Sequence, residues 1–143
     1  MKKILIALLL TLPLLAVAQD DYNYYEGSYW SVTSVDTKAG MFDAYIDDLD
    51  GLWRKQMDLM KASGKIKGYT MFSNVNARQG EPDLWLFVEW TSAGAALDTP
   101  RSEWDTMTTK RLGSIEESRE RNIARGDLRT IMSNTLLREL SFS

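Results

Sequence analysis

One carboxylate among aromatic residues is the feature of this sequence best suited to chemistry. Glu89 lies in residues 83–91 (DLWLFVEWT), where strand alternation puts it on the same face as Trp85 and Phe87. Aromatic surroundings would desolvate the carboxylate and raise its pKa, so that Glu89 could act as an acid or base near neutral pH. A solvated glutamate near a strand end, or one paired with an arginine, is the alternative interpretation.

Two arginines near the C-terminus are the natural counter-charges. Arg138 lies in residues 135–142 (TLLRELSF), which read as a β-strand, and Arg129 lies shortly before it. An inward-pointing Arg138 could bind a carboxylate ligand, or pair with Glu89 or Glu139. A solvated arginine that protects a sheet edge is an equally good interpretation.

The absence of two residue types excludes several kinds of site. The 143 residues contain no His and no Cys, which rules out a His general base, a Cys nucleophile, a disulfide, a Cys/His zinc site and a His-ligated haem. Serine catalysis would lack its His partner, and no glycine loop has the spacing that cradles phosphate. We therefore expect no cofactor and no metal.

Two short motifs invite stronger interpretations than their residues support. Residues 47–51 (DDLDG) resemble a calcium loop, but its first and last ligand positions would be Ile46 and Met57. We interpret these aspartates as the solvated face of a helix. Residues 125–127 (RGD) spell an adhesion tripeptide, which a helix-ending glycine between two charged residues explains equally well.

The N-terminus has the layout of a secretory signal peptide. Lys2 and Lys3 precede an apolar stretch of 15 residues, 4–18, that ends in the small residues Ala16-Val17-Ala18. This stretch is shorter than the roughly 20 residues of a membrane-spanning helix. We predict cleavage after Ala18 and a periplasmic or secreted protein, with no membrane contact after cleavage.

The predicted mature chain is one small acidic domain. It keeps 15 basic and 20 acidic residues over 125 positions, a net charge of −5 that argues against nucleic acid as a partner. Residues 19–27 read as an acidic, Tyr-rich leader, and residues 28–143 as a single domain.

The domain should alternate strands and helices in the order β-α-β-β-α-β. Strands are predicted at 28–36, 68–76, 83–91 and 135–142. One long helix is predicted from Gly40 to about Gly64, and a second begins at Thr99-Pro100 and runs into the charged segment 116–121. This order predicts an α+β, ferredoxin-like fold, with a four-stranded antiparallel sheet and both helices on one face.

Two helices on one face would leave the other face of the sheet open. Strand 83–91 is apolar on both faces, with Leu84 and Leu86 on one and Trp85 and Phe87 on the other. Because a soluble monomer avoids such exposure, we expect a second copy to pack sheet to sheet and form a homodimer.

With these elements the chain resembles the dimeric α/β-barrel superfamily, in particular its uncharacterised exported members. The resemblance covers residues 28–142 and rests on the element order, the long first helix after Lys38-Ala39-Gly40, and residues 84–90 (LWLFVEW). It implies two ferredoxin-like subunits that close a shared barrel. The superfamily includes haem-dependent enzymes and cofactor-free quinol-type monooxygenases. Because this chain has no His, it departs from the branches in which a histidine is the haem ligand or the base.

Two functions follow as hypotheses. The first is an exported binding or stress-related protein with a pocket between the sheets for a small apolar or aromatic molecule. The second is a cofactor-free enzyme that acts on quinol-type aromatics, with Glu89 as its base. The residues expected to line the pocket, chosen because they combine aromatic walls with a few polar groups, are Trp30, Tyr69, Met71, Trp85, Phe87, Glu89 and Arg138.

Overall fold

A computed structural model describes residues 22–143 of the chain. The predicted signal peptide, residues 1–18, and the start of the predicted leader lie outside the described residues. Within residues 22–143, no helix is both long and apolar enough to cross a membrane.

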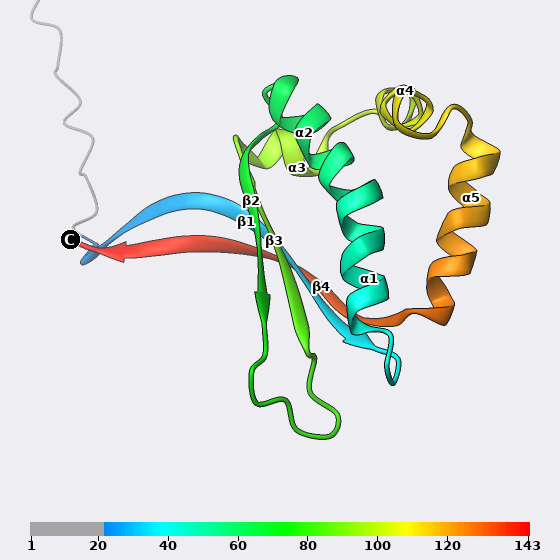
Figure 1. Cartoon of the computed structure of the whole chain (residues 1–143). Coiled ribbons are helices and arrows are strands. Elements are labelled where there is room, and N and C mark those ends of the chain that lie inside the picture. The colour runs from blue at the N-terminus through cyan, green and yellow to red at the C-terminus, as the bar shows by residue number, and fades with distance from the viewer. Residues whose placement is uncertain (1–21) are drawn as a thin grey trace, which may run out of the picture.

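The described chain forms one sheet with helices on one of its faces (Figure 1). The strands are β1 (Tyr24–Thr37), β2 (Ile66–Ser73), β3 (Leu84–Trp90) and β4 (Arg129–Phe142). Between β1 and β2 lie α1 (Phe42–Asp48), the π-helical segment η1 (Leu49–Trp53) and α2 (Arg54–Ala62). Between β3 and β4 lie α3 (Ala93–Leu97), α4 (Arg101–Leu112), α5 (Ile115–Ala124) and the 3₁₀ turn η2 (Arg125–Asp127).

The sheet has the topology that the element order predicts. Its strand order is β2-β3-β1-β4, and every neighbouring pair is antiparallel. Two strand–helix–strand units interleaved in this order define the ferredoxin-like fold. The predicted α+β class and fold are thus confirmed.

The core lies between the sheet and the helices. The residues of β3 alternate between buried and half-buried, and the buried set faces the helices. One cluster gathers Met57, Met60, Ile66, Val88, Trp90 and Met107. A second gathers Val35, Tyr45, Leu49, Leu84 and Leu86. The alternation predicted for β3 is confirmed, because Leu84 and Leu86 are buried while Trp85 and Phe87 face the other way.

Several boundaries differ from the sequence prediction. Strand β1 begins at Tyr24, so residues 24–27 of the predicted leader are strand, and β4 begins at Arg129 rather than at residue 135. The second predicted helix is broken at Gly113, whose φ of 87° lies in the left-handed region that favours glycine. The chain then starts α5 with Ser114 as its N-cap.

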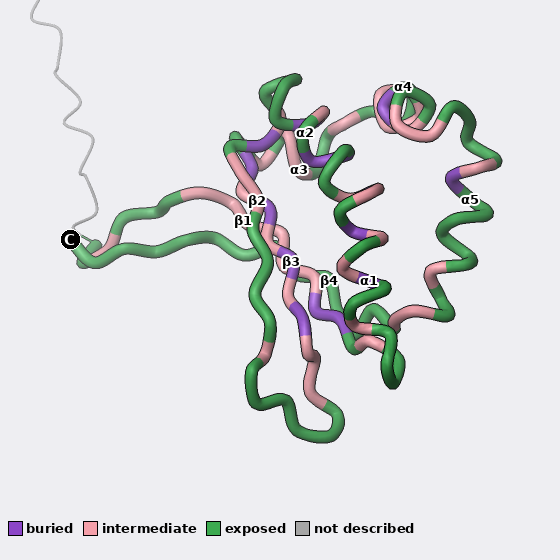
Figure 2. Tube along the Cα trace, in the orientation of Figure 1, coloured by how far each residue is buried: buried purple, intermediate pink, exposed green. Residues whose placement is uncertain are grey.

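Strand β4 is the most exposed strand of the sheet. Every residue of β4 after Arg129 is exposed, including Leu136, Leu137 and Leu140 (Figure 2). Strand β1 pairs with β4 over its whole length but with β3 only from Tyr29 to Val35. The far ends of β1 and β4 therefore continue beyond the sheet as a two-stranded ribbon (Figure 1).

Candidate functional site

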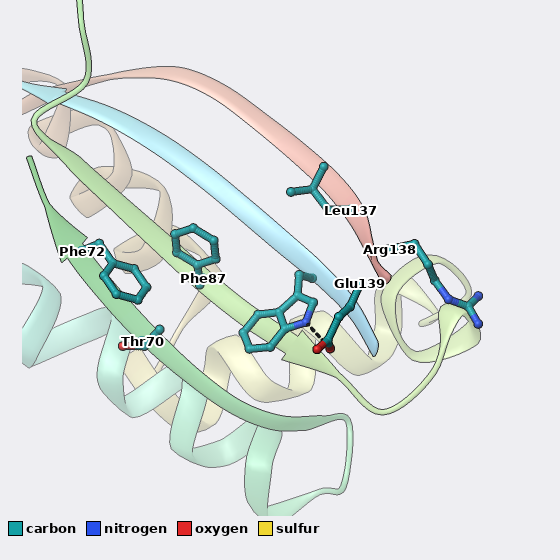
Figure 3. A pocket seen from close by; sticks show the side chains of 7 residues that line it. Thr70, Phe72, Phe87, Leu137, Arg138 and Glu139 are labelled. Carbon is teal, nitrogen blue, oxygen red and sulfur yellow. Dashed lines mark hydrogen bonds between the residues drawn. The ribbon is translucent and has the colours of Figure 1, made fainter. Parts of the chain in front are cut away.

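The sheet face opposite the helices carries an apolar depression of about 400 Å³ (Figure 3). Residues from all four strands line it because paired residues in neighbouring strands point to the same face. The lining residues are Trp30, Thr70, Phe72, Phe87, Leu137, Arg138 and Glu139.

Three aromatic rings form the wall of the depression. The ring of Phe87 lies edge-on to Phe72, with ring centroids 5.2 Å apart, and to Trp30, at 6.4 Å. Edge-to-face packing of this kind is the favoured geometry for aromatic pairs. Phe72 remains 56% exposed, so much of its ring is open to a ligand or to another chain.

Glu139 supplies the carboxylate of the depression. Its Oε2 accepts a hydrogen bond from the indole Nε1 of Trp30 at 3.3 Å, across the β1–β4 pair (Figure 3). Glu139 is two residues from Leu137 on the same strand, and both therefore reach the open face. The site thus combines flat apolar walls with one acceptor and the hydroxyl of Thr70.

Glu89 lies on the open face but not in the depression. Its carboxylate accepts a hydrogen bond from the Ser28 hydroxyl at 2.6 Å and lies 3.4 Å from Lys67 Nζ. Glu89 is thus a paired residue near a strand end, as in the alternative interpretation, but its partner is Lys67 and not an arginine. Trp85 shares this face but lies outside the lining set.

The two β2 residues predicted to line the pocket lie on the sheet face that packs against the helices, and not on the open face. Tyr69 and Met71 pair with Val88 and Leu86, which face the helices. The change of face arises at the start of β2, where the register of β2 against β3 shifts between Ile66 and Gly68. Such a bulge reverses the alternation that follows it, so the neighbours of Tyr69 and Met71, Thr70 and Phe72, line the depression instead.

Arg138 borders the depression, but its guanidinium is directed away from the other lining side chains (Figure 3). It donates a hydrogen bond to the Tyr29 hydroxyl, lies 4.3 Å from the centre of the Tyr29 ring, and is 3.1 Å from Glu26 Oε2. Of the two interpretations of Arg138, the inward arginine that pairs with Glu89 or Glu139 is therefore wrong. Of the two partners that Arg138 contacts, Glu26 lies in the predicted leader and Tyr29 lies in the first predicted strand.

Two aspartates of the motif at residues 47–51 form ion pairs within the fold. Asp50 pairs with Arg54 one helical turn away, at 2.9 Å, while Asp48 pairs with Arg125 and is only 17% exposed. Asp48 thus does not belong to the solvated helix face on which the sequence placed it. No group of three or more acidic side chains within residues 22–143 is arranged to hold a metal ion.

The fold and the open apolar face together define an α+β protein of ferredoxin-like topology. No protein-family profile and no curated protein sequence matches the chain. Among solved structures it is similar to a dimeric ferredoxin-like protein from an uncultured marine organism, with 10% identity and a TM-score of 0.48. That similarity covers 83% of this chain and 90% of the other. The fold class rests on the strand order and connections rather than on this similarity.

Proposed function

We propose that this protein is an exported homodimer of the dimeric α/β-barrel type that binds a small apolar or aromatic molecule between its two sheets. The depression walled by Trp30, Phe72 and Phe87 is the observation that carries the proposal. An aromatic-lined concavity with a few polar groups is the usual form of a small-molecule site.

The open face supports the dimer. Phe72 and Leu137 are 56% and 47% exposed, on a face that no described helix covers. Contiguous apolar surface of this kind marks an interaction site. A two-fold axis would bring the same patch of a second copy against it, as in isologous dimers, and would enclose the two depressions between the sheets.

The lining chemistry supports a flat, apolar ligand with one hydrogen-bond donor. The aromatic rings offer stacking and edge contacts, and the only carboxylate among the lining residues is Glu139. The second hypothesis, a quinol-type monooxygenase with Glu89 as base, gains no support from this geometry, because Glu89 lies outside the depression and is held by Ser28 and Lys67.

The test measures assembly and binding on the same samples. Residues 19–143 should sediment as a dimer at micromolar concentration and bind 1-naphthol saturably in equilibrium dialysis. Phe87→Ser should weaken 1-naphthol binding at least tenfold, because it removes the ring shared by both aromatic pairs. The matched control is Val75→Ser, an apolar side chain that is 96% exposed and lies outside the depression.

A monomer that binds no 1-naphthol would overturn the proposal. Turnover of a hydroquinone under oxygen, abolished in Glu139→Gln or Glu89→Gln, would instead favour the enzyme. Export is tested separately, because a protein purified from the periplasm or medium should begin at Gln19 by mass spectrometry. A mass that retains residues 1–18 would contradict cleavage.

A further inference from the structure

Two arginines, one from η2 and one from β4, lie beside Asp48 and Tyr45 of α1. Arg125 Nε lies 2.6 Å from Asp48 Oδ2, as an ion pair whose N–H is not aligned for a hydrogen bond. The guanidinium carbons of Arg125 and Arg129 lie 5.6 and 5.9 Å from the centre of the Tyr45 ring. Two cations therefore share one buried ring, which gives each a cation–π contact.

A third arginine reaches this group from the last turn of α4. Burial lowers the pKa of Arg111, repulsion from Arg125 lowers it further, and attraction to Asp48 opposes both. The Nε of Arg111 is buried and has no hydrogen-bond partner in the described part of the chain.

The group is short of negative charge. The three guanidinium groups have one carboxylate among them, and Arg129 Nε is buried without a hydrogen-bond partner as well. Over residues 22–143, neither Arg111 nor Arg129 has an acidic side chain within ion-pair distance. Because a cation that is partly removed from water without a counter-ion is destabilising, an anion from solution would stabilise this arrangement.

An open cleft leads to Arg111. It has a volume of about 490 Å³, and its lining residues come from α2 and α4: Lys55, Asp58, Leu59, Lys110 and Arg111. In the described chain both lysines lack an ion-pair partner, while Asp58 accepts a hydrogen bond from the Tyr69 hydroxyl at 2.8 Å. The cleft thus combines two surface cations with a partly buried guanidinium.

We propose that the cleft between α2 and α4 is a binding site for a phosphate or sulfate group, with Arg111 as its principal contact and Lys55 and Lys110 at its mouth. A guanidinium suits this role because its planar fork matches the oxygens of an oxyanion. Arg125, whose charge acts on Arg111, adds positive potential to the site. Basic residues such as Lys110 and Arg111 also stabilise a helix C-terminus through the helix dipole. That role alone does not explain why the Nε of Arg111 is buried without a hydrogen-bond partner.

The proposal is tested by NMR of the arginine Nε–H signals in the mature protein. Sodium phosphate at pH 7 should shift the Arg111 signal saturably, while sodium chloride at matched ionic strength should not. Arg111→Gln, and separately Lys55→Gln with Lys110→Gln, should weaken phosphate binding at least tenfold and fivefold, respectively. Arg119→Gln is the control, because Arg119 is 67% exposed on α5 and pairs with Glu116.

Phenyl phosphate is the second probe. Tighter binding of phenyl phosphate than of inorganic phosphate would identify a phosphorylated small molecule as the ligand class, and equal binding would identify the free ion. A shift that fails to saturate, or that chloride reproduces, would overturn the site. So would unchanged phosphate affinity in a folded Arg111→Gln protein. If that variant does not fold, the lysine pair, whose side chains are at the surface, decides the question.

Discussion

The hydroxyl of Tyr69 donates a hydrogen bond to Asp58 Oδ1 at 2.8 Å, and so ties β2 to α2. The Tyr69 ring also packs edge-on against Trp53, with centroids 5.1 Å apart. Tyr69 is therefore part of the packing between sheet and helices, and not of the open face on which the sequence analysis placed it.

This contact makes stability depend on pH in the alkaline range. Burial, followed by the hydrogen bond and the charge of Asp58, raises the pKa of Tyr69 above its ordinary value of 10.0. The folded state therefore holds the phenol proton more tightly than the unfolded state does. The contribution of protonated Tyr69 to folding stability is complete below pH 10 and is lost as pH rises through the folded-state pKa. Urea unfolding at pH 9 and pH 11 should show a smaller loss of stability in Tyr69→Phe than in the wild type. Equal losses in the two proteins would contradict this.

Asp48 should matter more to stability than its partner Arg125. Removing Asp48 leaves three arginines with no compensating charge, whereas removing Arg125 also relieves repulsion on Arg111. We expect Asp48→Asn to cost about 3–5 kcal/mol of unfolding free energy, the range for a broken buried pair, and Arg125→Gln to cost less. Denaturant unfolding of both variants checks the order, and the reverse order would contradict it.

Helix α5 should open more readily than α2. Its only buried residue is Ser118, while Ile115 and Ile123 are 41% and 72% exposed. The described apolar clusters include no residue of α5. Amide hydrogen exchange should therefore be faster in α5 than in α2, since low local stability follows from few buried apolar contacts.

A cap variant sharpens the test of α5. The Ser114 hydroxyl accepts a hydrogen bond from the Glu117 amide at 3.1 Å. Ser114→Ala should destabilise the helix by about 1 kcal/mol and speed exchange in α5 while leaving α2 unchanged. Uniform acceleration through both helices would show that α5 opens only with the whole domain.

The open face should be where the proposed dimer associates. Leu137→Lys places a charge beside the aromatic depression, and we expect the dimer dissociation constant to rise at least tenfold, or about 1.4 kcal/mol. Leu97→Lys is the control, because Leu97 is 69% exposed on α3 and does not line the depression. Sedimentation over a concentration series measures both variants, and equal effects would argue against this face.

The fold was readable from the sequence because its signals are periodic. The alternation in β3 placed Leu84 and Leu86 toward the helices and Phe87 on the open face, as the structure has them. A period of two identifies the faces of a strand reliably only where the strand is regular. Of the residues predicted to line a pocket, Trp30, Phe87 and Arg138 line the depression, whereas their binding role remains a proposal.

The errors arise from irregular strands and long-range pairs. The slip at Ile66/Gly68 moved Tyr69 and Met71 to the helix face, and a second irregularity falls where β4 begins earlier than predicted, near Ile131. Gly68 is a sequence signal for the first irregularity, since an isolated glycine within a strand indicates a bulge, whereas no distinctive residue type marks the second. The pair of Asp48 with Arg125 joins residues 77 positions apart, a relationship that local pattern cannot show.

The pairing of β1 with β4 has a consequence for how this chain folds. Thr37 lies opposite Arg129 and Tyr24 opposite Phe142, so the two longest strands of the sheet meet only after almost the entire domain has been brought together. Contacts so distant in sequence slow folding. Synthesis of β4 should therefore be the step that commits the protein to its native state, and fragments that stop before Arg129 should remain targets for proteases.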